Sequence, residues 1–555
     1  MAKKSMSKGK IFLGIIAVFV LAAVLLAFLS QEKKLDKKTF IIGVPQEPDT
    51  LHPLFYQMMA SSEVQGLIFE SMVEYTDQWE LLPRIVESIP TIENGGLKKL
   101  SGNRLETTWK FKKDLKWSDG WPITAHDAVF AYQLIMDNNL PITSRDLENR
   151  IEKIEATDDQ TLVVTWKEPY AYTFVGHTFL PKHILEPIYK KDPTKFHLDA
   201  NYNRKPLGNG PFVVEEWSPG VSITLAANPN FSGEKPNFEK VIYKFVGTTS
   251  TLETELVSGG IDAISPTGTE LTQTLDFQKR KADEFNFYYI DGMVWEHMDC
   301  NLDNEILKDK KIRQALLYGM DREGITQKLF QGKQSVAHSW LPPKHYGYNP
   351  NVKKYPYDLA KAEQLLDEAG WKKQADGYRY KDGKPLEFTI MTTSGNSTRE
   401  SVQVLIQSDW KKIGVKLGIQ NQPPNVFFGD TMRYRKFPHF AIYAWVQSPI
   451  SDGESLWTIK NIPSKENNWQ GSNNPGWRNA EVDAIDSKVP VTLEESERKE
   501  LLQKEQVLWA EELPAFPLFW RVEPSVTTRT TSNWKPTGTS TPVTWNAEAW
   551  RAVAK

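Results

Sequence analysis

The sequence predicts a mixed α/β protein divided into several lobes, and three observations support this. At 555 residues the chain is too long for one compact hydrophobic core. Its 40% hydrophobic and 25% charged residues are typical of a folded soluble protein. From about residue 40 onward, short β-branched runs alternate with amphipathic segments, and no low-complexity linker separates them.

Five strands are predicted from apolar, β-branched runs bounded by glycine and proline turns. They cover Phe40–Val44, Leu105–Phe111, Thr161–Trp166, Pro211–Glu216 and Val221–Ala226. Mixed strands and helices over this length indicate an α/β chain, but the periodicity alone does not show how its lobes are connected.

Four helices have recognisable ends or apolar faces. Thr124 and Asp127 form a capping box, and Asp358 is the N-cap of a helix that stops at Gly370. Another helix ends at Gly414. The fourth carries apolar or small residues at the spacing of a buried helical face, namely Ile312, Ala315, Leu316, Gly319 and Met320.

Composition excludes several classes of function. A net charge of -3 offers no basic surface for nucleic acid. The single cysteine, Cys300, permits no intramolecular disulfide and no thiolate metal cluster, and we expect it to be a buried packing residue. No phosphate-loop, dinucleotide, zinc-protease or serine-hydrolase motif occurs, and the nine histidines are scattered.

A binding protein is therefore expected, rather than an enzyme, with no cofactor and no metal. Metal ligands assembled from distant positions are the alternative. The acidic pairs Asp158–Asp159 and Glu511–Glu512 are interpreted as solvated charges in a turn and on a helix surface, not as acid–base catalysts.

The amino end suggests export. Four lysines precede the uncharged run Ile11–Leu29, whose 19 residues would span roughly 28 Å as a helix. This run is longer than the apolar region of an ordinary secretory signal, and Phe28 makes a poor cleavage site. We expect residues 1–39 to be an uncleaved membrane anchor with a spacer, and a removed signal is the alternative.

Ordered motifs from about residue 40 to 525 resemble one family. The most specific is Trp117–Phe130, which reads WSDGWPITAHDAVF, and Gly208–Phe212 supplies the central GNGPF. The opening segment Val44–Leu54, the KIRQAL run Lys311–Leu316 and LPAFPL at Leu513–Leu518 follow in the family's order. Together they resemble the extracytoplasmic solute-binding proteins of ABC importers, family 5, which bind peptides or nickel.

That resemblance implies a two-lobed periplasmic binding protein-like fold of the class II (cluster C) type, with an extra α/β domain inserted in the first lobe. The expected ranges are 40–80, 200–297 and 520–555 for lobe I, 81–199 for the extra domain, and 298–519 for lobe II. The chain should cross between lobes near Trp295–Asn301 and Phe516–Val522. Lobe closure would bury the ligand, because the ligand binds the closed state better.

The same resemblance places the ligand between the lobes. Peptide-binding relatives hold the ligand's amino terminus with a lobe II aspartate, but here Trp445 lies near that place and the nearest carboxylate is Asp452. The indole would stack on a sugar ring or an apolar side chain, or turn into the core. Arg433 and Arg435 would meet a ligand carboxylate or form a solvated basic turn. The residues expected to bind ligand are Met59, Ser61, Trp295, Arg433, Arg435, Tyr443, Trp445, Phe519 and Trp520.

The expected function is capture of a peptide or other small solute and its delivery to the permease subunits of an ABC importer. The protein would be a monomer in the periplasm or elsewhere outside the cytoplasm, held to the inner membrane if residues 11–29 are retained. A tethered sensory or regulatory binding module is the second hypothesis, and a hydrolase with dispersed acids is the third.

Overall fold

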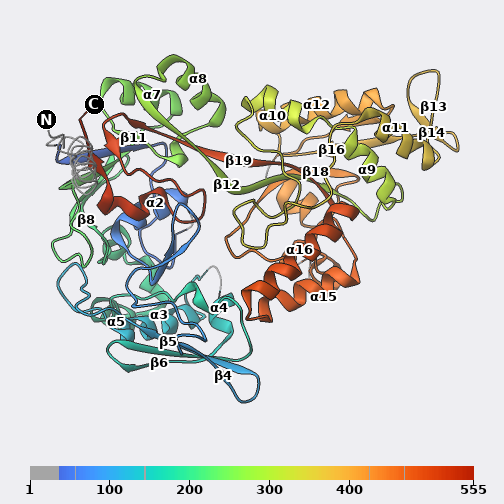
Figure 1. The fold of residues 1–555 in the computed structure, drawn as a ribbon. Helices are drawn as coiled ribbons and strands as arrows, with labels where there is room; N and C mark the ends of the chain where they lie inside the picture. Colours follow the sequence, from blue (N-terminus) through green and yellow to red (C-terminus); the bar gives the residue numbers. More distant parts are fainter. Residues whose placement is uncertain are drawn as a thin grey trace, which may run out of the picture.

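The computed structural model describes residues 37–554, except 57, 143–144, 424–425, 468 and 470. The predicted anchor at residues 11–29 lies outside the described residues. Two lobes lie side by side, and the long strands β12 and β19 run from one to the other (Figure 1). Within the described ranges, no helix is both long and apolar enough to cross a membrane.

The two crossing strands are the centre of one large sheet. β12 (Phe285–Cys300) and β19 (Ala515–Thr528) are antiparallel neighbours in the order β17-β16-β18-β12-β19-β11-β1-β10-β9-β8. Their pairing is interrupted between Asp291 and Trp295, opposite Trp520–Val522. Beyond this break, β12 also pairs with β18 (Phe440–Val446) of lobe II. A β-bulge of this kind bends a ladder locally, so this break is the natural hinge.

On β12 this break precedes the predicted first crossing, Trp295–Asn301, by a few residues. Residues Trp295–Cys300 already pair with β18 of lobe II. On β19 the break lies within the predicted second crossing, Phe516–Val522. The domain bounds given above stay predictions.

Lobe I contains the amino-terminal strand and the C-terminal segment. β1 pairs in parallel with β10 and β11, and β10 continues through β9 to β8 as an antiparallel meander. Helix α2 covers this sheet, and Val64, Leu67 and Ile68 enter its core. The strands predicted at residues 40–44, 211–216 and 221–226 are confirmed within two residues. The lobe I elements are β1 (Thr39–Val44), α2 (Met59–Ile68), β8 (Phe212–Ser218), β9 (Ser222–Ala227), β10 (Lys240–Phe245), α7 (Thr249–Ser258), β11 (Ala263–Ile264), α8 (Leu271–Lys281), β20 (Thr531–Ser532) and β21 (Arg551–Ala552).

The extra domain is a four-stranded antiparallel sheet in the order β4-β5-β7-β6. Its core is built around Trp109, Trp117 and Trp166. The capping box of α3 is confirmed, since the backbone N–H of Thr124 donates to Asp127 Oδ2 at 2.9 Å. The elements between residues 73 and 204 are β2 (Val73–Tyr75), β3 (Leu81–Pro83), β4 (Leu97–Leu100), β5 (Arg104–Lys110), α3 (Ala125–Met136), α4 (Asp146–Asn149), β6 (Ile151–Asp158), β7 (Thr161–Trp166), α5 (Lys182–Lys191) and α6 (Ala200–Arg204).

Lobe II packs helices around the β16-β17-β18 end of the sheet. Asp358 caps α11 through the backbone N–H of Lys361 at 2.9 Å, and Gly370 and Gly414 have the positive φ angles of helix ends. Cys300 is fully buried in this core, as predicted. The lobe II elements are α9 (Lys310–Tyr318), α10 (Arg322–Phe330), α11 (Leu359–Glu368), β13 (Lys372–Lys373), β14 (Arg379–Lys381), β15 (Lys384–Pro385), β16 (Glu387–Met391), α12 (Ser397–Lys412), β17 (Lys416–Ile419), β18, α14 (Glu454–Trp457), α15 (Ala480–Lys488) and α16 (Glu495–Glu512).

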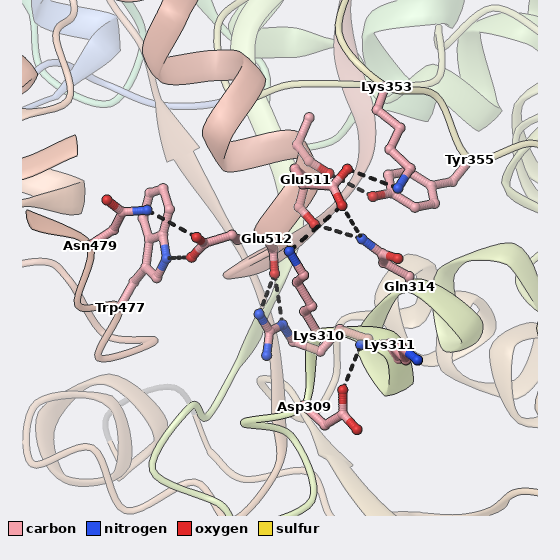
Figure 2. Close-up of polar contacts among 12 residues, drawn as sticks. Asp309, Lys310, Lys311, Gln314, Lys353, Tyr355, Trp477, Asn479, Glu511 and Glu512 are labelled. Carbon is pink, nitrogen blue, oxygen red and sulfur yellow. Dashed lines mark hydrogen bonds and ion pairs between the residues drawn. The ribbon is translucent and has the colours of Figure 1, made fainter. Parts of the chain in front are cut away.

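The acidic pair at the end of α16 has a structural role that the sequence did not reveal. Figure 2 shows Glu512 accepting hydrogen bonds from the Trp477 indole at 2.6 Å and the Asn479 amide at 3.0 Å. Glu511 accepts from Lys353 at 2.9 Å and Gln314 at 3.1 Å. Burial raises the pKa of Glu511, but these hydrogen bonds hold it below its ordinary value. Both side chains stay partly exposed, but they also tie α16 to neighbouring segments, which the prediction of solvated charges did not include.

Candidate functional site

Lobe II also contacts the β2–β3 turn and the extra domain, away from the hinge strands. The Lys344 Nζ of lobe II donates to the Asp77 carbonyl oxygen, between β2 and β3, at 3.4 Å. The backbone N–H of Ala171, in the extra domain, donates to the Pro490 carbonyl at 2.7 Å, and the Arg498 guanidinium lies 5.8 Å from the Tyr172 ring centre. The space between the lobes is therefore bordered by the hinge on one side and by these contacts on another.

A cavity of about 470 Å³ lies beside α2, and we call it the α2 cavity. Its walls come from one face of α2, from β2, from residues 175–179 of the extra domain and from residues 540–542 near the carboxyl end. This volume is within the usual range for small-molecule sites. Residues 53–81, 147–148, 175–179 and 540–542, four segments far apart in sequence, thus contribute to one pocket.

The charged side chains that line the α2 cavity are all acidic, namely Glu70, Glu74 and Glu148. Glu70 is paired with the Arg84 guanidinium. Glu74 instead accepts from neutral hydroxyls, Thr541 Oγ1 at 2.8 Å and Ser71 Oγ at 3.2 Å. Burial is the main cause that raises the pKa of Glu74 above its ordinary value.

A second cavity, of about 450 Å³, lies at the hinge and has walls from both lobes. We call it the hinge cavity. Glu296 of β12 accepts from Arg399 Nε of α12 at 2.5 Å and from Arg521 Nε of β19 at 2.9 Å. Burial alone would raise the pKa of Glu296, but the charges of Arg521 and Arg399 hold it below its ordinary value. This ion network joins the crossing strands to a helix of lobe II.

Five of the nine predicted site residues are occupied elsewhere. The Trp295 and Trp520 side chains are buried in the aromatic core of lobe II. Ser61 is fully buried and donates to Asp49, while the Tyr443 hydroxyl donates to Asp299 and accepts from Asn474. Arg435 pairs with Asp303 at 2.8 Å and donates to the Asn474 carbonyl at 2.8 Å. In this structure these five side chains are thus packed in a core or paired with protein groups, and their role in ligand binding stays a prediction.

The other four are exposed, partly buried or beside a cavity. Met59, at the start of α2, is 54% exposed. Trp445 is partly buried, packing against the lobe II cores with its ring 5.8 Å from that of Tyr443. Arg433 is exposed and lies over Tyr434. Phe519 is buried but lines the hinge cavity. Their role in ligand binding remains a prediction.

Glu74, Gln65 and Glu296 were not anticipated. Each lies in an ordinary strand or helix with no motif around it, and their partners or fellow wall residues come from distant positions. The Glu296–Arg521 contact, for example, spans 225 positions in the sequence. Only the acidic residue Glu296 within the mostly apolar run Met293–Met298 would have given a signal.

The structure has two lobes joined by two continuous strands, one cavity beside α2 and another at the hinge. This arrangement is typical of a protein that captures a ligand. The chain matches the family model of the bacterial extracellular solute-binding proteins, family 5, over residues 80–466, and it belongs to that family. The predicted family and two-lobed fold are thus confirmed, together with the predicted role as the substrate-binding component of an ABC importer. Its place is accordingly outside the cytoplasm.

Relatives support the assignment over most of the chain. A solved oligopeptide-binding protein from Thermus thermophilus, complexed with a pentapeptide, is 32% identical, with a TM-score of 0.68 and coverage of 93% of this chain and 96% of that one. The oligopeptide-binding protein AppA of Bacillus subtilis is 27% identical over 86% of this chain and 88% of its own length. NikZ of Campylobacter jejuni, in complex with Ni(L-His), is 26% identical, with a TM-score of 0.70 and coverage of 93% and 100%.

Proposed function

We propose that the solute is a peptide, which the two lobes enclose and present to the permease without chemical change. The observation that carries this proposal is the 32% identity, over 93% of the chain, to a binding protein solved with a pentapeptide. The α2 cavity supports it, because its volume suits part of a peptide and its wall offers hydroxyl, amide and carboxylate groups.

Native mass spectrometry of protein purified without denaturation tests the proposal. We expect a mass increment that corresponds to bound peptide, and binding of synthetic pentapeptides by isothermal titration calorimetry. Failure of every peptide to bind, with tight binding of a nickel–amino-acid chelate, would contradict it. The bound peptide should be recovered with its mass unchanged after long incubation, since relatives are named as binding proteins.

We also propose that the protein acts as a monomer and that residues 11–29 keep it at the inner membrane. The length of this apolar run supports the tether. Cell fractionation with mass measurement of the mature amino terminus tests it, since a protein starting after residue 29 in the soluble fraction would overturn the tether. Light scattering of the purified protein tests the monomer.

A further inference from the structure

The α2 cavity carries an acidic group that the protein itself leaves without a paired counter-ion. Among the described residues, no lysine or arginine lines this cavity, and none forms an ion pair with Glu74. The neighbouring Glu70 differs, because Arg84 neutralises it. The charge of Arg84 also lowers the pKa of Glu74, but by less than burial raises it. Among the described residues, the half-buried Glu74 accepts hydrogen bonds only from neutral groups, namely two hydroxyls and the Tyr75 backbone N–H. Such a carboxylate is costly to ionise, and a cation placed beside it would lower that cost.

Gln65 and His177 give an independent indication of a ligand. Both line the cavity, and Gln65, on α2, is only 9% exposed. Gln65 Nε2 and His177 Nε2 are buried, and neither has a hydrogen-bond partner among the described residues. Buried amide groups in native proteins are nearly always paired, so an unpaired one that lines a cavity points to a missing partner. The amide N–H requires an acceptor, such as a carbonyl oxygen.

We propose that the α2 cavity is a subsite for a cationic group of the ligand, an ammonium or a guanidinium. Glu74 is its counter-ion, and the Gln65 amide donates to a neighbouring carbonyl oxygen of the same ligand. This inference rests on the proposed capture of a peptide, and it narrows the ligand to peptides with a free amino terminus or a basic side chain.

The position of Glu74 is consistent with the missing aspartate in lobe II, where Trp445 lies near the place expected for that acid. The carboxylate nearest to the expected lobe II acid is Asp452, whose pKa is raised to about 6 chiefly by burial. Asp452 is surrounded by protein groups, with Glu454 and Tyr172 close to it. Glu74 lies instead on the side of lobe I and the extra domain, at the wall of an open cavity. Lobe I and the extra domain, rather than lobe II, would therefore supply the counter-ion for a cationic ligand.

Matched pairs of synthetic pentapeptides test this subsite. One pair differs only in a free or acetylated amino terminus, and the other in lysine or norleucine at one position. We expect the cationic member of one pair to bind the wild-type chain about 10- to 100-fold more tightly, the range for a charged hydrogen-bonded contact. The pair that shows the difference identifies which cation occupies the cavity.

Two variants should remove the preference for the cationic peptide over its neutral analogue, each in a different way. Glu74→Gln keeps an acceptor for Thr541 but loses the charge, and Ser62→Lys places a cation on the half-buried cavity face of α2. In both we expect the cationic peptide to lose about 10- to 100-fold in affinity, while its neutral analogue is unchanged. Glu106→Gln, on β5 outside the cavity, is the control that should keep the preference. If Glu74→Gln does not fold, Ser62→Lys decides.

The outcomes separate this inference from the proposed function. If peptides bind but neither pair shows a difference, or if the preference survives in the folded variants, the subsite is wrong and peptide capture stands. Equal loss of the preference in Glu106→Gln would also overturn the subsite, because the effect would then be a general one of net charge. If no peptide binds the wild-type chain at all, the proposed function and the subsite fall together.

Discussion

Glu296 at the hinge and Glu505 in lobe II are both glutamates with almost no solvent exposure, 2% and 0%. Glu296 contacts two guanidinium groups, and their charges keep its pKa low despite burial. Within the part of the chain that the structure describes, Glu505 accepts only from the Trp340 indole, at 2.8 Å, and burial raises its pKa to about 8. Its neighbour Asp486 is also buried, and its pKa is raised by burial and by the charge of Glu505.

The difference shows that burial alone does not decide whether a carboxylate is charged. At neutral pH Glu296 is an anion that joins the crossing strands to α12, while Glu505 holds its proton and belongs to a neutral core. The contacts at the hinge, where the chain passes between the lobes, therefore depend on the charge of Glu296. Around Glu505, by contrast, lobe II supplies an indole N–H from Trp340, which belongs to an aromatic core cluster.

The largest effect is expected from Glu296→Gln. This change leaves the buried Arg399 guanidinium without its anion, and removing one partner of a buried pair costs about 3–5 kcal/mol. Urea denaturation at pH 7 measures the loss. Glu523→Gln is the matched control, because Glu523 lines the same cavity and has its pKa raised to about 7 chiefly by burial. If both variants lose equal stability, the ion network is not what stabilises the hinge.

Glu505→Gln should act in the opposite direction. An unfolded glutamate ionises near pH 4.3, whereas Glu505 in the folded chain ionises near pH 8. The folded state thus binds more protons between these values, and its stability falls as pH rises through that window. The variant removes this dependence and should be more stable than wild type by about 1–3 kcal/mol at pH 8. Identical slopes of stability against pH in the two proteins would show that Glu505 is ionised when folded.

Arg521→Gln tests how much the exposure of a partner matters. Arg521 also binds Glu296, but its side chain is 38% exposed, whereas that of Arg399 is 10% exposed. Because solvent screens the more exposed pair and Arg399 still neutralises Glu296, we expect a loss of about 1 kcal/mol. The same urea titrations measure it. A loss as large as that of Glu296→Gln would mean that the network acts as one unit.

Asp358→Ala should have the smallest effect of the four. Asp358 is an exposed carboxylate that caps α11 by accepting from the Lys361 backbone N–H. Loss of such a cap costs about 0.5–1 kcal/mol. Asp358→Asn, which keeps the acceptor, is the control and should stay close to wild type in thermal unfolding. If the asparagine variant is as weak as the alanine variant, charge rather than capping is responsible.

Much of the fold was predictable because its signals are local. The helix ends at Thr124, Asp358 and Gly370 depend on a few adjacent residues, and the strand at Thr161–Trp166 has the bounds that its apolar run predicted. The candidate site was less predictable. Trp295 and Trp520 were expected at the ligand, but they pack in a core whose other indoles, such as Trp457, come from distant segments.

The amino-acid sequence alone was enough to predict the family, the two-lobed α/β architecture, and the places of five strands and four helices. These follow from ordered motifs and from periodicities over a few residues, which survive without knowledge of long-range contacts. Which carboxylates carry charge, and which buried polar groups lack a protein partner, became visible only in the folded structure. Those properties depend on burial and on partners such as Arg521 for Glu296 or Thr541 for Glu74, brought together from 225 and 467 positions apart. No local pattern encodes such distances.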